Sequence, residues 1–327
     1  MDTSRRIFIM QATALALTSP ALTWASTSRY PNKAVRFHIP YAPGAATDTL
    51  GRLAAEVYSK TLGQPFVVEN KGGAGSVIGT NLLAASAPDG YAIGMVDSAF
   101  TINPGLRGKD LPYDTFKDFA PISLMATAPF VMVVHPSVPA TDIASFLALA
   151  KEKPGELAYG SAGVGSAPHL AGAQLQQQAN INIQHIPYRG GGTVFTDLLG
   201  GQFEFAFGTV PTLNPHIKDG RLRAIAVTSA QRVQSLPDVP TFAEAGLPGV
   251  DTSPIFGIVA PAGVPADIIA QLSSTLAQSV QHGALHQKLT DRGFTPIGST
   301  PEQFEQRIHE EVAKWTELIQ KGGFKAE

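Results

Sequence analysis

The stretch Val35-Arg36-Phe37-His38-Ile39-Pro40-Tyr41-Ala42-Pro43-Gly44-Ala45-Ala46-Thr47-Asp48 runs from a strand pattern, through a turn of small residues, into the start of a helix. Val35, Phe37 and Ile39 alternate with polar residues, which is the period of a half-buried strand. Apolar residues then recur at helical spacing up to Gly63, where the helix is expected to end. Because the first turn of a helix leaves backbone N–H groups without partners, a turn with such small side chains indicates an anion-binding site.

A second turn of the same kind occupies residues 159–169, between a predicted strand and a predicted helix. Ser166 stands at the N-cap and Pro168 in the first turn of that helix. Two such helix ends facing each other across a cleft could hold carboxylates, because each end has roughly half a positive charge. Tight strand-to-helix turns require small residues in any case, so a purely structural role is the alternative for each turn.

Strand and helix patterns alternate along the chain, which is typical of α/β proteins with mainly parallel sheets. The expected strands are residues 34–39, 66–69, 91–96, 130–135, 157–161, 183–186, 204–207, 222–227 and 255–260. The expected helices are residues 48–62, 75–86, 142–152, 167–179, 193–199, 266–282 and 301–321. The last helix has an apolar stripe that predicts docking on the body of the protein, formed by Phe304, Ile308, Val312, Trp315 and Ile319.

Two extended segments, near residues 128–135 and 252–260, predict that the chain crosses twice between two lobes. Lobe 1 would then consist of residues 29–128 plus 255–327, and lobe 2 of residues 129–254. A cleft between two α/β lobes is a usual place for a ligand.

The composition narrows the class of protein. The chain has 327 residues, 44% hydrophobic and 15% charged, which is enough for two domains with sizeable cores. A formal net charge of −2 gives no field that would attract nucleic acid or an anionic membrane. Cysteine is absent, which excludes disulfides and thiolate metal sites. No motif for a metal or a nucleotide is complete, so we predict no metal and no cofactor.

The first 25 residues have the pattern of an export signal of the Sec or the twin-arginine type. Arg5-Arg6 precede an apolar run from Ile7 to Leu22, and small residues suited to cleavage follow. The run is too short and too interrupted by polar residues and proline to span a bilayer stably. We therefore expect residues 1–25 to be removed and the protein to work in the periplasm of a Gram-negative bacterium.

Individual side chains near the turns have two possible roles. Asp48 could bind a ligand ammonium group or position a water molecule, or it could cap its helix together with Thr47. His169 could reach a carboxylate or be an ordinary, partly buried histidine. Three serines could donate hydrogen bonds to an anion, or serve as local turn and cap hydroxyls: Ser98, Ser161 and Ser166.

A series of short segments follows in a characteristic order. The segments are Pro43-Gly44 with Asp48, Val68-Glu69-Asn70-Lys71, Gly73-Ala74-Gly75, Ala87-Pro88-Asp89-Gly90-Tyr91, Ile102-Asn103-Pro104, Leu111-Pro112-Tyr113, Lys117-Asp118-Phe119-Ala120-Pro121, Pro187-Tyr188-Arg189-Gly190, Asp197-Leu198-Leu199-Gly200-Gly201, Ala226-Val227-Thr228-Ser229, Leu236-Pro237-Asp238-Val239-Pro240-Thr241, Glu244-Ala245-Gly246 and Ala260-Pro261-Ala262-Gly263. Through this series the chain resembles the Bug/TctC family of periplasmic solute receptors, which serve tripartite tricarboxylate transporters.

The resemblance implies a two-lobed, periplasmic-binding-protein-like fold of type II that closes around a small-molecule carboxylate. It also implies a monomer without catalytic activity, whose partners are the membrane subunits of the transporter. In lobe 1 the ligand would be gripped by Tyr41, Ala45, Ala46, Thr47 and Asp48. In lobe 2 the corresponding residues are Ser161, Ala162, Gly163, Gly165, Ser166 and His169. Ser98, Tyr188 and Thr209 complete the predicted site.

The chain departs from the family's usual pattern in ways that make the pocket less polar. Ala45 replaces a usual glycine, Val164 a frequently polar residue, and Gly208-Thr209 a frequent Asp-Asn pair. Ile255 also stands where an aromatic residue is common. We therefore hypothesise that the ligand is a mono- or dicarboxylate with an apolar or aromatic body, rather than citrate.

Two alternatives to a transport receptor remain open. An exported enzyme could act on a carboxylate or ester with Ser161 or Ser166 and His169, although the G-x-S-x-G nucleophile elbow is missing. A sensory receptor could dock on a signalling partner instead of a permease.

Overall fold

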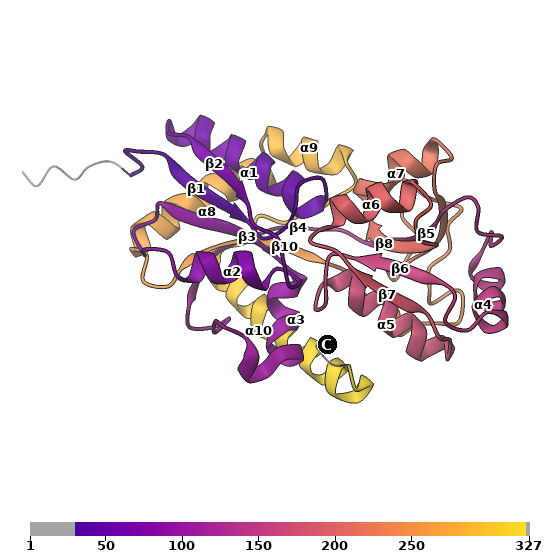
Figure 1. The fold of residues 1–327 in the computed structure, drawn as a ribbon. Coiled ribbons are helices and arrows are strands. Elements are labelled where there is room, and N and C mark those ends of the chain that lie inside the picture. Colours follow the sequence, from indigo (N-terminus) through magenta and orange to yellow (C-terminus); the bar gives the residue numbers. More distant parts are fainter. Residues whose placement is uncertain (1–29, 325–327) are drawn as a thin grey trace, which may run out of the picture.

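The computed structural model describes residues 30–324. The predicted export signal and the last three residues lie outside this part. The described chain forms two lobes side by side, each with a sheet flanked by helices (Figure 1). The prediction of a two-lobed α/β fold is confirmed. Among residues 30–324, no helix combines the length and apolar content needed to cross a membrane.

The sheet of the first lobe has six strands in the order β11-β4-β10-β3-β1-β2. The strands are β1 (Val35–Ile39), β2 (Phe66–Asn70), β3 (Ala92–Asp97), β4 (Phe119–Thr127), β10 (Ile255–Pro261) and β11 (Thr295–Pro296). The helices of this lobe are α1 (Ala46–Leu62), α2 (Val77–Ala84), α3 (Ser98–Arg107), α8 (Ala266–Gln281), α9 (Ala284–Asp291) and α10 (Pro301–Gly322), with a short 3₁₀ turn at Gly108–Asp110. Buried Phe37, Ile39 and Leu50 lie in the core between this sheet and α1.

The sheet of the second lobe has five strands in the order β7-β6-β8-β5-β9. The strands are β5 (Phe130–Val134), β6 (Ala158–Ser161), β7 (Gln184–Pro187), β8 (Phe205–Thr209) and β9 (Arg223–Val227). The helices are α4 (Ile143–Glu152), α5 (Ala167–Ala179), α6 (Gly191–Leu199) and α7 (Val210–Lys218). The first sheet thus takes its strands from residues 35–127 and 255–296, and the second from residues 130–227, which supports the lobe boundaries we propose.

The expectation of mainly parallel sheets is wrong, because both sheets are mixed. β10 pairs antiparallel with β3 and β4, and β5 pairs antiparallel with β8 and β9. Two consecutive strands can run parallel only if a crossover connection brings the chain back to the end of the sheet at which the first strand began. β4 passes directly into β5 through Ala128 and Pro129, without such a crossover, and β10 follows β9 of the second lobe after residues 228–254, which contain none of the named helices or strands.

The sequence patterns missed several elements for identifiable reasons. β4 contains Pro121, and proline is disfavoured inside strands. α3 and α7 contain Pro104 and Pro215 in their interiors, where proline normally argues against a helix. The short α9 and the two-residue β11 were also missed. α1 begins at Ala46, before the expected residue 48, so that Thr47 lies in its first turn.

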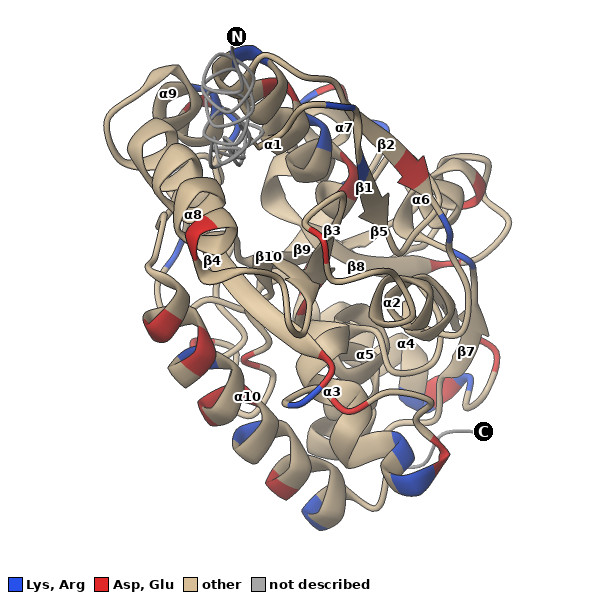
Figure 2. Cartoon of the chain, turned by 90° about the vertical axis from the view of Figure 1, so that its left-hand side faces the viewer, with Lys and Arg blue, Asp and Glu red and all other residues tan. Residues whose placement is uncertain are grey.

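α10 packs against both lobes, and its predicted docking is confirmed. Phe304 and Ile308 belong to a hydrophobic cluster of the first lobe, with partly buried Val312 packed against it. Trp315 and Ile319 belong to the large cluster that includes strands of the second lobe. Acidic and basic residues are interspersed along the outer side of this helix (Figure 2).

Candidate ligand-binding site

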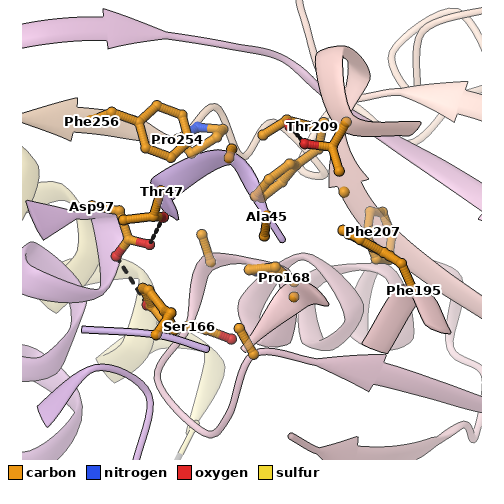
Figure 3. A pocket seen from close by; sticks show the side chains of 18 residues that line it. Ala45, Thr47, Asp97, Ser166, Pro168, Phe195, Phe207, Thr209, Pro254 and Phe256 are labelled. Carbon is orange, nitrogen blue, oxygen red and sulfur yellow. Dashed lines mark hydrogen bonds between the residues drawn. The ribbon is translucent and has the colours of Figure 1, made fainter. Parts of the chain in front are cut away.

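A pocket lies between the lobes, with an empty volume of about 490 Å³ (Figure 3). The first lobe and the return crossing contribute Tyr41, Ala45, Ala46, Thr47, Asp97, Pro254 and Phe256. The second lobe contributes Phe130, Ala162, Ser166, Ala167, Pro168, Gly191, Phe195, Phe207, Gly208, Thr209 and Thr212.

Five helices begin at this pocket, and one of them, α3, is capped by the side chain of Asp97. The other four are α1, α5, α6 and α7. Their N-cap residues, Ala45, Ser166, Gly190 and Thr209, make no side-chain capping hydrogen bond. In α1, the first backbone bond of the helix runs from the Thr49 N–H to the Ala45 carbonyl over 3.0 Å, so the preceding N–H groups have no partner in the helix. The pocket therefore receives the positive ends of four helices without a side-chain cap, in addition to the capped end of α3.

No lysine, arginine or histidine is among the described residues that line the pocket. The positive potential comes from backbone dipoles, helped by hydroxyl groups such as that of Thr209, which lies 2.8 Å from the Thr212 hydroxyl. This combination suits a carboxylate held by N–H and O–H donors rather than by an ion pair.

The rest of the wall is apolar. Phe195, Phe207 and Phe256 line the pocket together with two prolines, Pro168 and Pro254 (Figure 3). Phe130 is a fourth lining phenylalanine. Aromatic side chains offer large contact areas to an apolar ligand body. The pocket thus combines helix N-termini with apolar and aromatic walls.

Asp97 is the acidic residue of the pocket, and sequence reasoning missed it. It ends β3 and caps α3 by accepting a hydrogen bond from the Ala99 N–H at 3.0 Å. Its carboxylate also accepts hydrogen bonds from the Tyr41 hydroxyl at 3.1 Å and the Thr47 hydroxyl at 3.2 Å. Burial raises the pKa of Asp97 to about 6, against the lowering effect of these hydrogen bonds. The sequence signal that could have revealed Asp97 is an acidic N-cap residue directly after a strand. It was missed because α3, the helix that Asp97 caps, was not predicted.

The structure brings half of the predicted site residues together in the pocket. Those that line it are Tyr41, Ala45, Ala46, Thr47, Ala162, Ser166 and Thr209. The others lie beside it, behind the lining residues or in the contact between the lobes: Asp48, Ser98, Ser161, Gly163, Gly165, His169 and Tyr188.

Asp48 is turned away from the pocket and holds the turn before α1. Its carboxylate accepts hydrogen bonds from the Gly44 N–H at 3.1 Å, from Asn70 Nδ2 at 2.9 Å, and from the Arg52 guanidinium. Asn70 Nδ2 also donates to the Tyr41 carbonyl at 3.0 Å. Burial acts to raise the pKa of Asp48, but the hydrogen bonds from Arg52, Asn70 and Gly44 together hold it below its ordinary value. Asp48 is therefore a positioning residue for the turn.

Ser161 and His169 do not form a pair in this structure. The Ser161 hydroxyl is buried and lies 2.6 Å from Nε2 of His185, while Nδ1 of His169 accepts a hydrogen bond from the Gly165 N–H at 3.3 Å. The hydroxyl of Ser98 accepts from the Ile255 N–H at 3.0 Å, and that of Tyr188 donates to Asp197 at 2.8 Å. These four side chains support the walls of the pocket and do not line it.

The lobes touch through backbone at the rim of the pocket. The Ala42 N–H donates to the Arg189 carbonyl over 3.3 Å. A Cβ atom on Gly192 would lie 2.0 Å from the Pro43 carbonyl oxygen, and one on Gly75 would lie 2.0 Å from the Val164 carbonyl oxygen. Gly163 and Gly165 have φ values of +114° and +86° and approach Gly75 and Asn103 in the same way. Glycine is thus required where the two predicted turns meet the opposite lobe.

Two α/β lobes, two crossings and a pocket between them at which helices begin define the class of two-lobed solute-binding proteins. The model of the tripartite tricarboxylate transporter family receptor, TctC, matches residues 50–324. The chain belongs to this family, which confirms the resemblance seen in the sequence.

Individual relatives agree with this assignment. Protein BugT of Bordetella pertussis is 35% identical over 301 residues, covering 92% of each chain. A solved structure of a periplasmic transporter is 39% identical with a TM-score of 0.88, covering 91% of this chain and 100% of that one. The structure of R. palustris Rpa4515 with adipate is 30% identical with a TM-score of 0.87, covering 90% of this chain and 99% of the other.

Proposed function

We propose that this protein binds an organic carboxylate between its lobes and delivers it to the membrane subunits of a tripartite tricarboxylate-type transporter. The observation that supports this most strongly is the convergence of four uncapped helix N-termini on a pocket without a basic side chain. Such ends bind anions through backbone N–H groups. The adipate in the structure of Rpa4515 shows that a relative of similar fold holds a carboxylate.

The proposed ligand has an apolar or aromatic body. Four phenylalanines line the pocket, and Ala45 and Gly208 contribute no polar side-chain atom to it. Val164 does not line the pocket but packs against the core of the second lobe, and Ile255 is buried in a cluster of the first lobe. Two of the departures from the family pattern, Ala45 and Gly208-Thr209, therefore bear directly on the ligand.

Transport fits the geometry better than catalysis. Ser161 is 1% exposed and its hydroxyl is engaged with the Gly163 backbone and His185, which leaves it without access to a pocket ligand. The Ser166 hydroxyl donates to the Gly163 carbonyl at 2.6 Å. We propose a monomeric, non-catalytic receptor that works in the periplasm after loss of residues 1–25.

A thermal-shift screen of the mature protein against a panel of carboxylates tests this function. A ligand present at 100 times its dissociation constant should stabilise the protein by about 2.7 kcal/mol. The panel includes citrate, aliphatic and aromatic monocarboxylates, and dicarboxylates. Stabilisation by a sugar or a cation but by no carboxylate would overturn the proposal. Calorimetric binding of citrate, without binding of any apolar or aromatic carboxylate, would overturn the predicted ligand body.

A further inference from the structure

Asp97 places a carboxylate in a pocket that is otherwise built to attract one. It lines the wall beside Thr47 and Tyr41, at the end of the pocket formed by the first lobe (Figure 3). The residue is mostly buried but keeps some exposed surface. Its side chain is therefore placed to meet whatever part of a ligand lies against this wall.

The hydrogen bonds of Asp97 leave room for one more donor. Oδ1 accepts from the Ala99 N–H and the Tyr41 hydroxyl, whereas Oδ2 accepts only from the Thr47 hydroxyl among the described groups. A carboxylate offers about four acceptor positions, two on each oxygen. The free position on Oδ2 suits an N–H or O–H group of a ligand, and a second carboxylate has no proton to offer it.

Among the described residues, no cationic side chain near Asp97 balances its negative charge, which is offset in part by the N-terminus of α3 that it caps. The ionisable side chains described around it are two tyrosines, Tyr41 and Tyr113. Burial raises the pKa of both above the ordinary value, so both remain neutral at pH 7. No cationic side chain is present among the described lining residues. With a pKa of about 6, Asp97 is mostly ionised at neutral pH in the empty pocket.

The pocket is consequently polarised from one lobe to the other. The wall of the second lobe holds the N-termini of α5, α6 and α7, each with roughly half a positive charge. The wall of the first lobe holds the N-termini of α1 and α3, but the negative charge of Asp97, the N-cap of α3, lies on the same wall and offsets them. A ligand carboxylate is therefore favoured at the second lobe, with the opposite end of the ligand beside Asp97.

We propose that Asp97 is a specificity-determining residue that selects carboxylates with a hydrogen-bond donor at the far end, above all a protonated amine, and disfavours dicarboxylates. This inference rests on the proposed function, because it presumes that a carboxylate occupies the pocket. It adds to that function a direction for the ligand and a chemical class for its second end.

Three six-carbon acids test the inference by calorimetry at pH 7.5, because they differ only at the far end: hexanoate, adipate and 6-aminohexanoate. The mature protein should bind 6-aminohexanoate at least tenfold more tightly than adipate, and also more tightly than hexanoate. In Asp97→Asn the preference over adipate should fall at least tenfold. Asparagine is also a good N-cap, so the variant retains the cap of α3. Asp142→Asn makes the same change at the exposed N-cap of α4, outside the pocket, and should keep the wild-type ranking.

Three results would overturn the inference: adipate binding as tightly as 6-aminohexanoate to the wild-type protein, no binding of 6-aminohexanoate, or an unchanged ranking in Asp97→Asn. The first two need no variant, so they hold even if Asp97→Asn fails to fold. Failure of the proposed function has a different signature, since no carboxylate of the wider panel would then bind at all.

Discussion

Asp48 shows how a conspicuous acidic residue can act on a ligand without touching it. Its oxygen atoms tie together Gly44 at the turn, Arg52 on α1 and Asn70 at the end of β2. The turn that these bonds hold in place presents Ala45, Ala46 and Thr47 to the pocket. A contact with a ligand ammonium group, the other role that the sequence allowed, would need the carboxylate to face the opposite way.

Replacing Asp48 distinguishes the two roles. Asp48→Ala should lower the free energy of unfolding by about 1–3 kcal/mol, because hydrogen bonds to a charged group are lost, and should weaken every carboxylate ligand similarly. Urea denaturation and calorimetry with hexanoate and 6-aminohexanoate measure both effects. Unchanged stability with a loss of binding confined to 6-aminohexanoate would instead indicate a direct contact with the ammonium group.

His169 and His185 make the stability of the second lobe depend on pH. Their rings lie 4.4 Å apart. Burial, with smaller effects from His185 and Arg107, lowers the pKa of His169 from 6.5 to about 3, and burial lowers that of His185 to about 4. The folded protein therefore keeps both rings neutral in a range where the unfolded chain takes up protons.

Stability should consequently fall as the pH decreases from about 6.5 towards 4, by at most about 1.4 kcal/mol per pH unit for each histidine. Above pH 6.5 these two groups should contribute no slope. Urea midpoints at pH 7.5, 6 and 5 measure the effect, and His185→Gln should reduce the slope. The same slope in the variant as in the wild type would contradict the assignment to His185.

At the scale of elements, the beginning of α6 and the turn before α1 form a backbone contact that closes the rim. The absence of a side chain on Gly192 allows the Pro43 carbonyl to approach. Gly192 lies within a helix, where alanine is normally better tolerated than glycine. An alanine at this position should therefore hinder closure of the lobes without destabilising the helix.

Gly192→Ala should weaken carboxylate binding at least tenfold, because its Cβ atom would lie 2.0 Å from the Pro43 oxygen and the lobes would have to move apart. Its unfolding free energy without ligand should stay the same or rise by up to about 1 kcal/mol. Gly200→Ala is the matched control at the other end of α6, since its Cβ atom would meet no atom closer than the Asp197 carbonyl oxygen at 3.4 Å. Wild-type affinity in Gly192→Ala would show that this contact is not needed for binding.

At the scale of the whole molecule, α10 couples the two lobes mechanically. Its first half packs on the first lobe through Phe304 and Ile308, and its second half reaches the core that includes strands of the second lobe. Trp315 is fully buried there, and its indole N–H donates to Glu311 at 2.8 Å. The lobes therefore share one helix in addition to their two crossings.

We expect the wild-type protein to unfold in a single calorimetric transition. Trp315→Ala should lose about 3–5 kcal/mol and separate this transition into two, because the large buried side chain that joins α10 to the second core is removed. Trp315→Phe, which keeps most of the apolar contact, should retain one transition. Two transitions in the wild-type protein, or one in Trp315→Ala, would contradict this coupling.

The sequence by itself determined the features that depend on neighbours along the chain. Alternating Val35, Phe37 and Ile39, the helical spacing up to Gly63 and the stripe of the last helix each follow from local periodicity. The two small-residue turns were recognisable for the same reason, and the ordered segments identified the family. Ala45, Ala46, Thr47 and Ser166, which these patterns singled out, line the pocket.

Only the tertiary structure decided which groups face the ligand, because those contacts join residues far apart in the chain. Asn70 reaches Asp48 across two parallel strands and turns it away from the pocket. Asp97 enters the pocket because β3 ends beside α1 and caps a proline-containing helix that local periodicity did not reveal. The convergence of α6 and α7 on the same pocket likewise depends on the order and direction of strands, which no local pattern specifies.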